Sequence, residues 1–79
     1  LLTASINGFV DIVRLLIDAG ATVTADDNYP LILASTAGHY DIVEILLKRG
    51  ADPNARNGEA IINAQYNEHK KIVELLVLY

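Results

Sequence analysis

Apolar residues recur along the chain at the spacing of short amphipathic helices. The clearest case is the segment 41–48, where polar residues lie on one side and a broad apolar face is formed by Ile42, Val43, Ile45, Leu46 and Leu47. Asp41 places a carboxylate at the start of this segment, where the helix dipole favours negative charge. Gly50 follows the segment and can end the helix by adopting a positive φ. The pattern predicts a helix of about 8 to 10 residues.

Another predicted helix comes before this one. Pro30 suits the first turn of a helix, where its missing N–H costs nothing. Gly38 is placed to end that helix. The segment 51–59 contains the turn-forming dipeptide Asn57-Gly58, and we expect it to be an extended connector. The unit predicted by this pattern is two helices followed by a connector.

The chain repeats this unit at an offset of 30 residues. Columns of identical residues show the period, among them Gly8 and Gly38, Gly20 and Gly50, Ala4, Ala34 and Ala64, and Leu16, Leu46 and Leu76. A fixed period of about 20 to 50 residues is typical of a solenoid, in which neighbouring units bury a shared core. Helices this short are not stable alone in water, so their stability must come from stacking.

We therefore expect residues 1–79 to form one array of three units, at 1–28, 29–58 and 59–79. The first and last units are expected to be incomplete. The sequence has no initiator Met and begins on two leucines, and we interpret it as a piece of a longer chain. About three units are the minimum for a stable stack, so the predicted array has just enough of them.

The string from Gly38 to Ala55 resembles the second half of an ankyrin repeat. It reads Gly38-His39-x-Asp41-Ile42-Val43-x-x-Leu46-Leu47-x-x-Gly50-Ala51-Asp52-x-Asn54-Ala55. The segment 8–25 is a weaker copy, and 68–79 is a third. The resemblance implies an all-α fold, an ankyrin-type α-solenoid of stacked helix-turn-helix repeats with short connectors. It also implies a scaffold for protein–protein interaction with no chemistry of its own.

The sequence departs from the family pattern in three places. Its period is 30 residues, whereas the usual unit has about 33, and the missing residues fall in the connector, where the family has a projecting β-hairpin finger. The family's Thr-Pro-Leu-His opening is here Tyr29-Pro30-Leu31-Ile32, so the capping Thr and the bracing His are absent. Glu68 replaces the glycine of the middle unit, so the last turn between helices must form without glycine.

Register with the family's variable positions predicts where a partner binds. We expect binding at the connectors and on the groove-facing side of the first helices, through Asn28, Tyr29, Thr36, Asn57, Glu59, Asn63 and Tyr66. Tyr29 and Tyr66 are the expected hot spots, because tyrosine buries a large area and keeps a polar tip. The alternative for Tyr66 is that it covers an open end of the array. The alternative function is a structural spacer within a larger multidomain protein, with no specific partner of its own.

Composition and charge narrow the kinds of partner. Six Lys and Arg stand against ten Asp and Glu, which gives a net charge of −4. A nucleic-acid partner is not expected, since phosphate contacts need clustered Lys and Arg, whereas the acidity favours a protein partner with a basic face. No run of roughly 20 apolar residues could span a membrane, so no membrane partner is expected. A cytoplasmic location is the default interpretation.

Candidate chemistry is sparse. His39 and His69 occupy equivalent positions one repeat apart, where stacked helices lie about 8 to 10 Å from each other, which makes a shared zinc ion difficult. We interpret each as a turn histidine that hydrogen-bonds a neighbouring loop. The chain has no Cys and no glycine-rich phosphate loop, and its carboxylates are spread through all three units. The sequence predicts no enzyme activity, no metal site, no cofactor and no small-molecule substrate.

The carboxyl-terminal segment is apolar where the middle unit is basic. Leu78 and Tyr79 stand where the middle unit has Lys48 and Arg49. One interpretation is that a following element buries this helix. The other is that Leu78 and Tyr79 fold against their own repeat as a terminal cap. If the segment is exposed, its apolar patch favours aggregation or recruitment of a partner.

Overall fold

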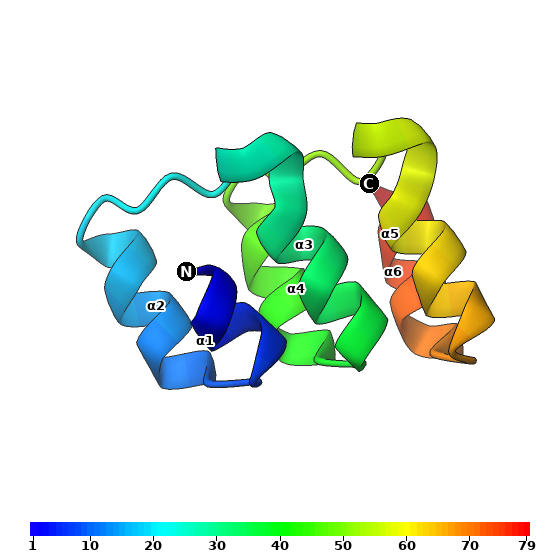
Figure 1. Cartoon of the computed structure of the whole chain (residues 1–79), viewed down its shortest axis with the longest axis horizontal. Coiled ribbons are helices and arrows are strands. Elements are labelled where there is room, and N and C mark those ends of the chain that lie inside the picture. The colour runs from blue at the N-terminus through cyan, green and yellow to red at the C-terminus, as the bar shows by residue number, and fades with distance from the viewer.

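Six α-helices and no strand make up the chain. The computed structural model describes all of residues 1–79. Its helices are α1 (Leu2–Ile6), α2 (Val10–Asp18), α3 (Ala25–Ala37), α4 (Tyr40–Lys48), α5 (Ala55–Tyr66) and α6 (Lys70–Leu78). They form three antiparallel pairs that stand side by side along the longest axis of the molecule (Figure 1). The body measures 31 × 20 × 19 Å.

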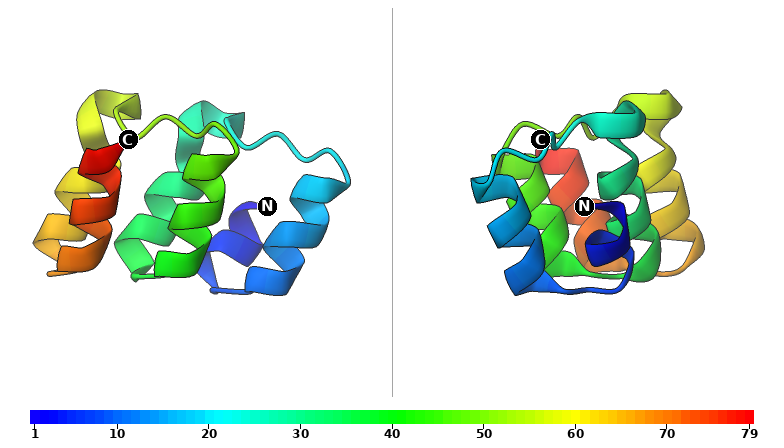
Figure 2. Two further views of the ribbon diagram at one scale, coloured as in Figure 1. Left: turned by 180° about the vertical axis from the view of Figure 1, so that it is seen from behind. Right: turned by 60° about the vertical axis from the view of Figure 1, so that its left-hand side comes forward.

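The pairs are arranged as two parallel rows of helices. Helices α1, α3 and α5 form one row, and α2, α4 and α6 form the other, which comes to the front when the molecule is seen from behind (Figure 2). Each helix packs against its partner in the same pair and against its counterpart in the next pair. The predicted all-α solenoid of stacked helix-turn-helix units is confirmed.

The turn inside each pair is built in the same way. The backbone N–H groups of Phe9, His39 and His69 donate to the carbonyl oxygens five residues earlier, at 3.0, 3.0 and 2.8 Å. The residue before each of these has a positive φ, which the left-handed turn requires. Gly38 adopts a φ of 86° without strain, and Glu68 adopts 62° at the third turn. A non-glycine residue in this region costs about 1–2 kcal/mol, so the third turn forms despite the missing glycine.

The connectors are shorter than predicted. The segment 51–59 was expected to be extended, but only residues 51–54 lie outside a helix. The next residues, Arg56, Asn57 and Gly58, make one left-handed turn with φ values of 53°, 57° and 77°. The stretch 26–28 makes the same turn one repeat earlier. Regular right-handed helix resumes after each turn, which leaves Pro30 in the first turn of its helix as predicted.

Histidine rings tie each helix pair to the pair before it. The His39 Nε2 atom lies 2.9 Å from the carbonyl oxygen of Ile6, and the His69 Nε2 atom lies 3.1 Å from that of Thr36. Each ring packs on the turn glycine of the preceding pair, where an added Cβ at Gly38 would come within 2.7 Å of the His69 ring. The prediction that both are turn histidines bonded to a neighbouring loop is confirmed.

One continuous hydrophobic core runs through the stack. Its 17 buried residues come from all six helices and both connectors. Leu46 lies at the centre, fully buried in the middle pair with neighbours on both sides. Ser5 and Ser35 are also fully buried, and their hydroxyl groups have no hydrogen-bond partner in the structure.

The carboxyl-terminal segment does not cap its own repeat. Leu75 and Leu76 are buried, whereas Leu78 is 82% exposed and Tyr79 is 53% exposed. The interpretation in which these last two side chains fold back on their own repeat is therefore wrong. Leu78 ends α6 at the position that the exposed Lys48 occupies at the end of α4, 30 residues earlier.

Leu46→Ala should unfold a large part of the population. Removing a fully buried leucine side chain costs about 2 to 5 kcal/mol, and here the cavity would open between three helix pairs. The matched control is Leu15→Ala, because Leu15 is 68% exposed on α2. The control should change the free energy of unfolding by no more than about 0.5 kcal/mol. Chemical denaturation followed by circular dichroism measures both, and equal losses would contradict this placement of the core.

Gly38→Ala should be more costly than Gly50→Ala. Both glycines have a positive φ, so alanine costs about 1–2 kcal/mol at either position. An added Cβ at Gly50 meets nothing within 4 Å, whereas at Gly38 it displaces the His69 ring and breaks its bond to Thr36. That bond adds about 1 kcal/mol to the loss. Thermal unfolding of the two variants measures the difference, which should vanish in a His69→Ala background.

Candidate partner-binding surface

The most exposed aromatic side chain lies near the end of α5. Tyr66 is 87% exposed, and Glu59 and Asn63 precede it by seven and three residues on the same helix. Residues at this spacing share one face of a helix, so the three form a stripe along α5. Glu59 and Asn63 are half-buried. We call this set the α5 stripe.

Tyr29 lies at the start of the regular part of α3, beside the next connector. The guanidinium carbon of Arg56 is 5.0 Å from the centroid of the Tyr29 ring, within the range of a cation–π contact. The Arg56 Nε atom is also 3.6 Å from a carboxylate oxygen of Asp27. Both charged side chains are largely exposed, so this pair contributes little to stability. Through these contacts Arg56, in the second connector, lies beside Asp27 and Tyr29 at the end of the first connector.

Two of the predicted binding residues are occupied by contacts inside the protein. Asn28 is only 8% exposed, and its Oδ1 atom accepts a hydrogen bond of 2.8 Å from the backbone N–H of Asp52. Thr36 is half-buried; its hydroxyl group donates to the carbonyl oxygen of Ile32 at 2.7 Å and accepts from the amide of Asn63 at 3.1 Å. The bonds to Asp52 and Asn63 link neighbouring repeats, and together these contacts leave both side chains little capacity for a partner.

The connectors carry a surplus of negative charge. Asp26, Asp27 and Asp52 are exposed, and Glu59 is half-buried at the end of the second connector. Arg56 is the single basic residue in these segments, and it is already beside Asp27. Asn57 is exposed between them in its left-handed turn. We call the side of the molecule formed by residues 26–29 and 52–59 the connector edge.

The comparison with protein families decides the identity of the repeat. A family model described as "Ankyrin repeats (3 copies)" matches residues 1–57, more than half of the chain. This chain belongs to the ankyrin-repeat family. The predicted resemblance is thereby confirmed. A comparison with curated proteins gave no match. Ankyrin repeats are generally modules for protein–protein interaction.

The third unit, residues 59–79, lies outside the matched residues 1–57 and keeps the same geometry. His69 sits on Gly38 as His39 sits on Gly8, with the same closest approach of 2.7 Å between an added Cβ and the ring. The family's projecting hairpin is replaced by the left-handed turns at 26–28 and 56–58. In this ankyrin array the connector edge is therefore built from short left-handed turns.

Sequence reasoning missed Arg56. Its contacts with Tyr29 and Asp27 join neighbouring units, as does the ion pair of 3.1 Å between Arg49 and Asp18. The signal was present, because the two ion pairs join residues 29 and 31 positions apart, close to the period of the repeat. Opposite charges at such an offset indicate contact between successive units in a solenoid.

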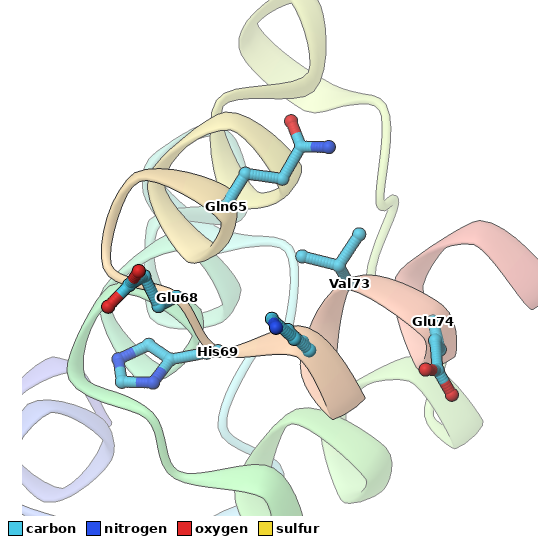
Figure 3. Close-up of a pocket in the computed structure, with 6 residues that line it drawn as sticks. Gln65, Glu68, His69, Val73 and Glu74 are labelled. Atoms are coloured by element: carbon cyan, nitrogen blue, oxygen red, sulfur yellow. The ribbon is translucent and has the colours of Figure 1, made fainter.

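The largest surface depression lies at the turn between α5 and α6. It is open, measures about 550 Å³, and is lined by Gln65, Glu68, His69, Lys70, Val73 and Glu74. In Figure 3 Glu68 and His69 lie together at the turn, with Gln65 and Glu74 directed away from them. The His69 ring is hydrogen-bonded to the carbonyl oxygen of Thr36 in the preceding unit.

No group of three or more His, Asp or Glu side chains is placed to hold a metal ion. None of the six helices is long and apolar enough to cross a membrane.

Proposed function

We propose that this ankyrin array is a scaffold that binds a segment of a partner protein along the connector edge and the α5 stripe. The observation that carries the proposal is Tyr66, which is 87% exposed at the end of α5 and is the most exposed aromatic side chain of the protein. Tyrosine on a rigid helix loses little conformational freedom when it is covered, which is why such side chains are enriched among binding hot spots. Tyr29 and Asn57 extend the proposed surface from α5 to the connectors.

The negative charge of the connector edge favours a partner segment that is positively charged. Three exposed aspartates and the half-buried Glu59 lie there, and Arg56 is the one basic residue among them. A segment rich in Lys and Arg would find unpaired carboxylates at Asp26 and Glu59 and the face of Tyr29 beside them. Charge complementarity of this kind raises the rate of association and selects against acidic partners. The scaffold is proposed to act without catalysis, cofactor or nucleic acid.

The experiment that tests the proposal begins with a selection for binding. Peptides selected from a displayed random library should be enriched in Lys and Arg, and a synthetic copy of the best one serves as the probe for calorimetric titration. A structural spacer would select no consensus sequence. That outcome would replace the scaffold with the spacer as the function of this chain.

Tyr66→Ala should weaken binding of the selected peptide by more than about 1 kcal/mol, or roughly fivefold or more in Kd. Tyr29→Ala should have an effect of similar size, because it removes the aromatic face beside the acidic connector. Tyr40→Ala is the matched control, since Tyr40 is exposed on α4, in the other row of helices. Unchanged affinity in both test variants would place the binding surface elsewhere.

Binding of the selected peptide should weaken as salt is added. The Debye length falls from about 10 Å at 0.1 M to about 3 Å at 1 M ionic strength, so attraction between the connector edge and a basic segment is screened. Asp26→Asn should reduce this salt dependence, whereas Asp11→Asn on α2 should leave it unchanged. An affinity that is indifferent to salt in the parent protein would contradict a basic partner.

A further inference from the structure

The single basic side chain of the connector edge lies against two other residues of that edge. The guanidinium carbon of Arg56 is 5.0 Å from the centroid of the Tyr29 ring, and the Arg56 Nε atom is 3.6 Å from a carboxylate oxygen of Asp27. An aromatic ring and a carboxylate are the two kinds of group that a guanidinium prefers, since it stacks on the first and pairs with the second. We call Asp27 and Tyr29 the arginine corner.

The arginine corner is held in place by the fold. Tyr29 packs against the hydrophobic core with part of its ring, which fixes the position of the exposed part. Both connectors run along the same side of the molecule, so residues 26–29 and 56 meet between the helix pairs (Figure 1). Each of these residues has a helix pair on either side along the row. The arginine corner is therefore an internal feature of the array.

The fold does not depend on Arg56 lying in this corner. The two connectors are already joined by the buried side chain of Asn28, whose Oδ1 atom accepts a hydrogen bond of 2.8 Å from the backbone N–H of Asp52. The side chains of Arg56 and Asp27 are 42% and 69% exposed, and an ion pair this exposed contributes little to stability. Arg56 is therefore free to leave the corner while the connectors stay folded.

The combination of a ring and a basic side chain occurs once along the connectors. One repeat before Arg56 the chain has Asp26, and one repeat after Tyr29 it has Glu59. The contacts that hold the repeats together behave differently, because the bond from a histidine to a carbonyl oxygen is made at both junctions. The arginine corner is thus an addition to the repeating frame at one place.

We propose that the arginine corner binds the guanidinium group of an arginine in the partner segment, and that Arg56 occupies the corner as an internal competitor until that arginine displaces it. The inference rests on the proposed function, in which the connector edge binds a basic segment. It adds that one position of the segment is arginine instead of lysine. A planar guanidinium lies on the Tyr29 ring while its N–H groups face the carboxylate of Asp27, which a single ammonium group does not do equally well.

Competition from Arg56 lowers the affinity of the free protein for such a segment. A ligand that binds only when a site is vacant has its apparent affinity reduced by the fraction of molecules in which the site is vacant. Arg56→Gln removes the competing guanidinium, leaves both residues of the corner unchanged, and keeps a non-glycine residue at the φ of 53°. This variant should therefore bind arginine more tightly than the parent protein does.

Calorimetric titration with two synthetic peptides of equal charge, hexa-arginine and hexa-lysine, tests the proposal. The ratio of the hexa-lysine Kd to the hexa-arginine Kd removes the general effect of charge, which is the same for both peptides. In Arg56→Gln this ratio should rise at least about threefold over that of the parent protein. Failure of hexa-arginine to bind either protein would overturn the proposal.

Arg49→Gln is the matched control for this titration. It also removes one positive charge and separates one exposed ion pair, because Arg49 lies 3.1 Å from Asp18, but no aromatic ring takes part in that contact. The ratio of the two Kd values should stay at the parent value in this control. Equal ratios in Arg49→Gln and Arg56→Gln would show that charge alone attracts the peptides, and would overturn the proposal.

Two further substitutions locate the bound arginine. Tyr29→Leu and Asp27→Asn, each made in the Arg56→Gln background, should return the ratio to the parent value, because each removes one of the two groups of the corner. A raised ratio that persists in both would place the arginine elsewhere and overturn the assignment of the site.

The displacement of Arg56 is followed by NMR in the parent protein. Nuclear Overhauser contacts between the Arg56 side chain and the Tyr29 ring should be present in the free protein and lost when hexa-arginine saturates it. Contacts that remain at saturation would contradict the exchange. A library-selected peptide that needs Tyr66 but binds Arg56→Gln and Arg49→Gln equally would overturn this inference alone, whereas a selection without any consensus would overturn the scaffold itself.

Discussion

The burial of one helix pair against the next is the interaction on which the whole structure depends. A single pair has helices too short to persist in water, and apolar residues on its two flanking faces stay exposed until a neighbouring pair covers them. The exposures of equivalent residues show this directly, since Ile42 is fully buried while Ile12 is half exposed. The fold is therefore a series of equivalent apolar contacts, and the middle pair takes part in both of them.

The polar contacts fix the spacing of that series. Each histidine ring fills the space above a turn glycine and donates a hydrogen bond from Nε2 to a carbonyl oxygen of the preceding pair. Asn28 and Arg56 join the first connector to the second. These contacts use up side chains that would otherwise be available to a partner. The surface that we propose for recognition is therefore confined to the connector edge, with its exposed carboxylates, and to the α5 stripe, which ends in an exposed tyrosine.

Much of the fold follows from the sequence because the repeat turns one weak pattern into three aligned copies. The helix pairs, the glycine turns and the roles of His39 and His69 were all predicted in this way. The connector 51–59 was misjudged, because Asn and Gly signal a turn without specifying three successive left-handed residues. Alignment with the variable positions of the family also predicted that Asn28 and Thr36 bind a partner. In the structure they are hydrogen-bonded to Asp52 and Asn63, which are 24 and 27 residues away along the chain. The local sequence pattern does not reveal contacts over such distances.

The claim that stacking supplies the stability is tested most directly by circular dichroism of a peptide that spans residues 29–58, one complete helix pair with its connector. The structure predicts a spectrum dominated by coil, with no cooperative thermal transition, because the neighbours that bury Ile32, Ile42 and Leu47 are missing. A helical spectrum that melts cooperatively would show that one pair holds its own core, and would contradict the account given above.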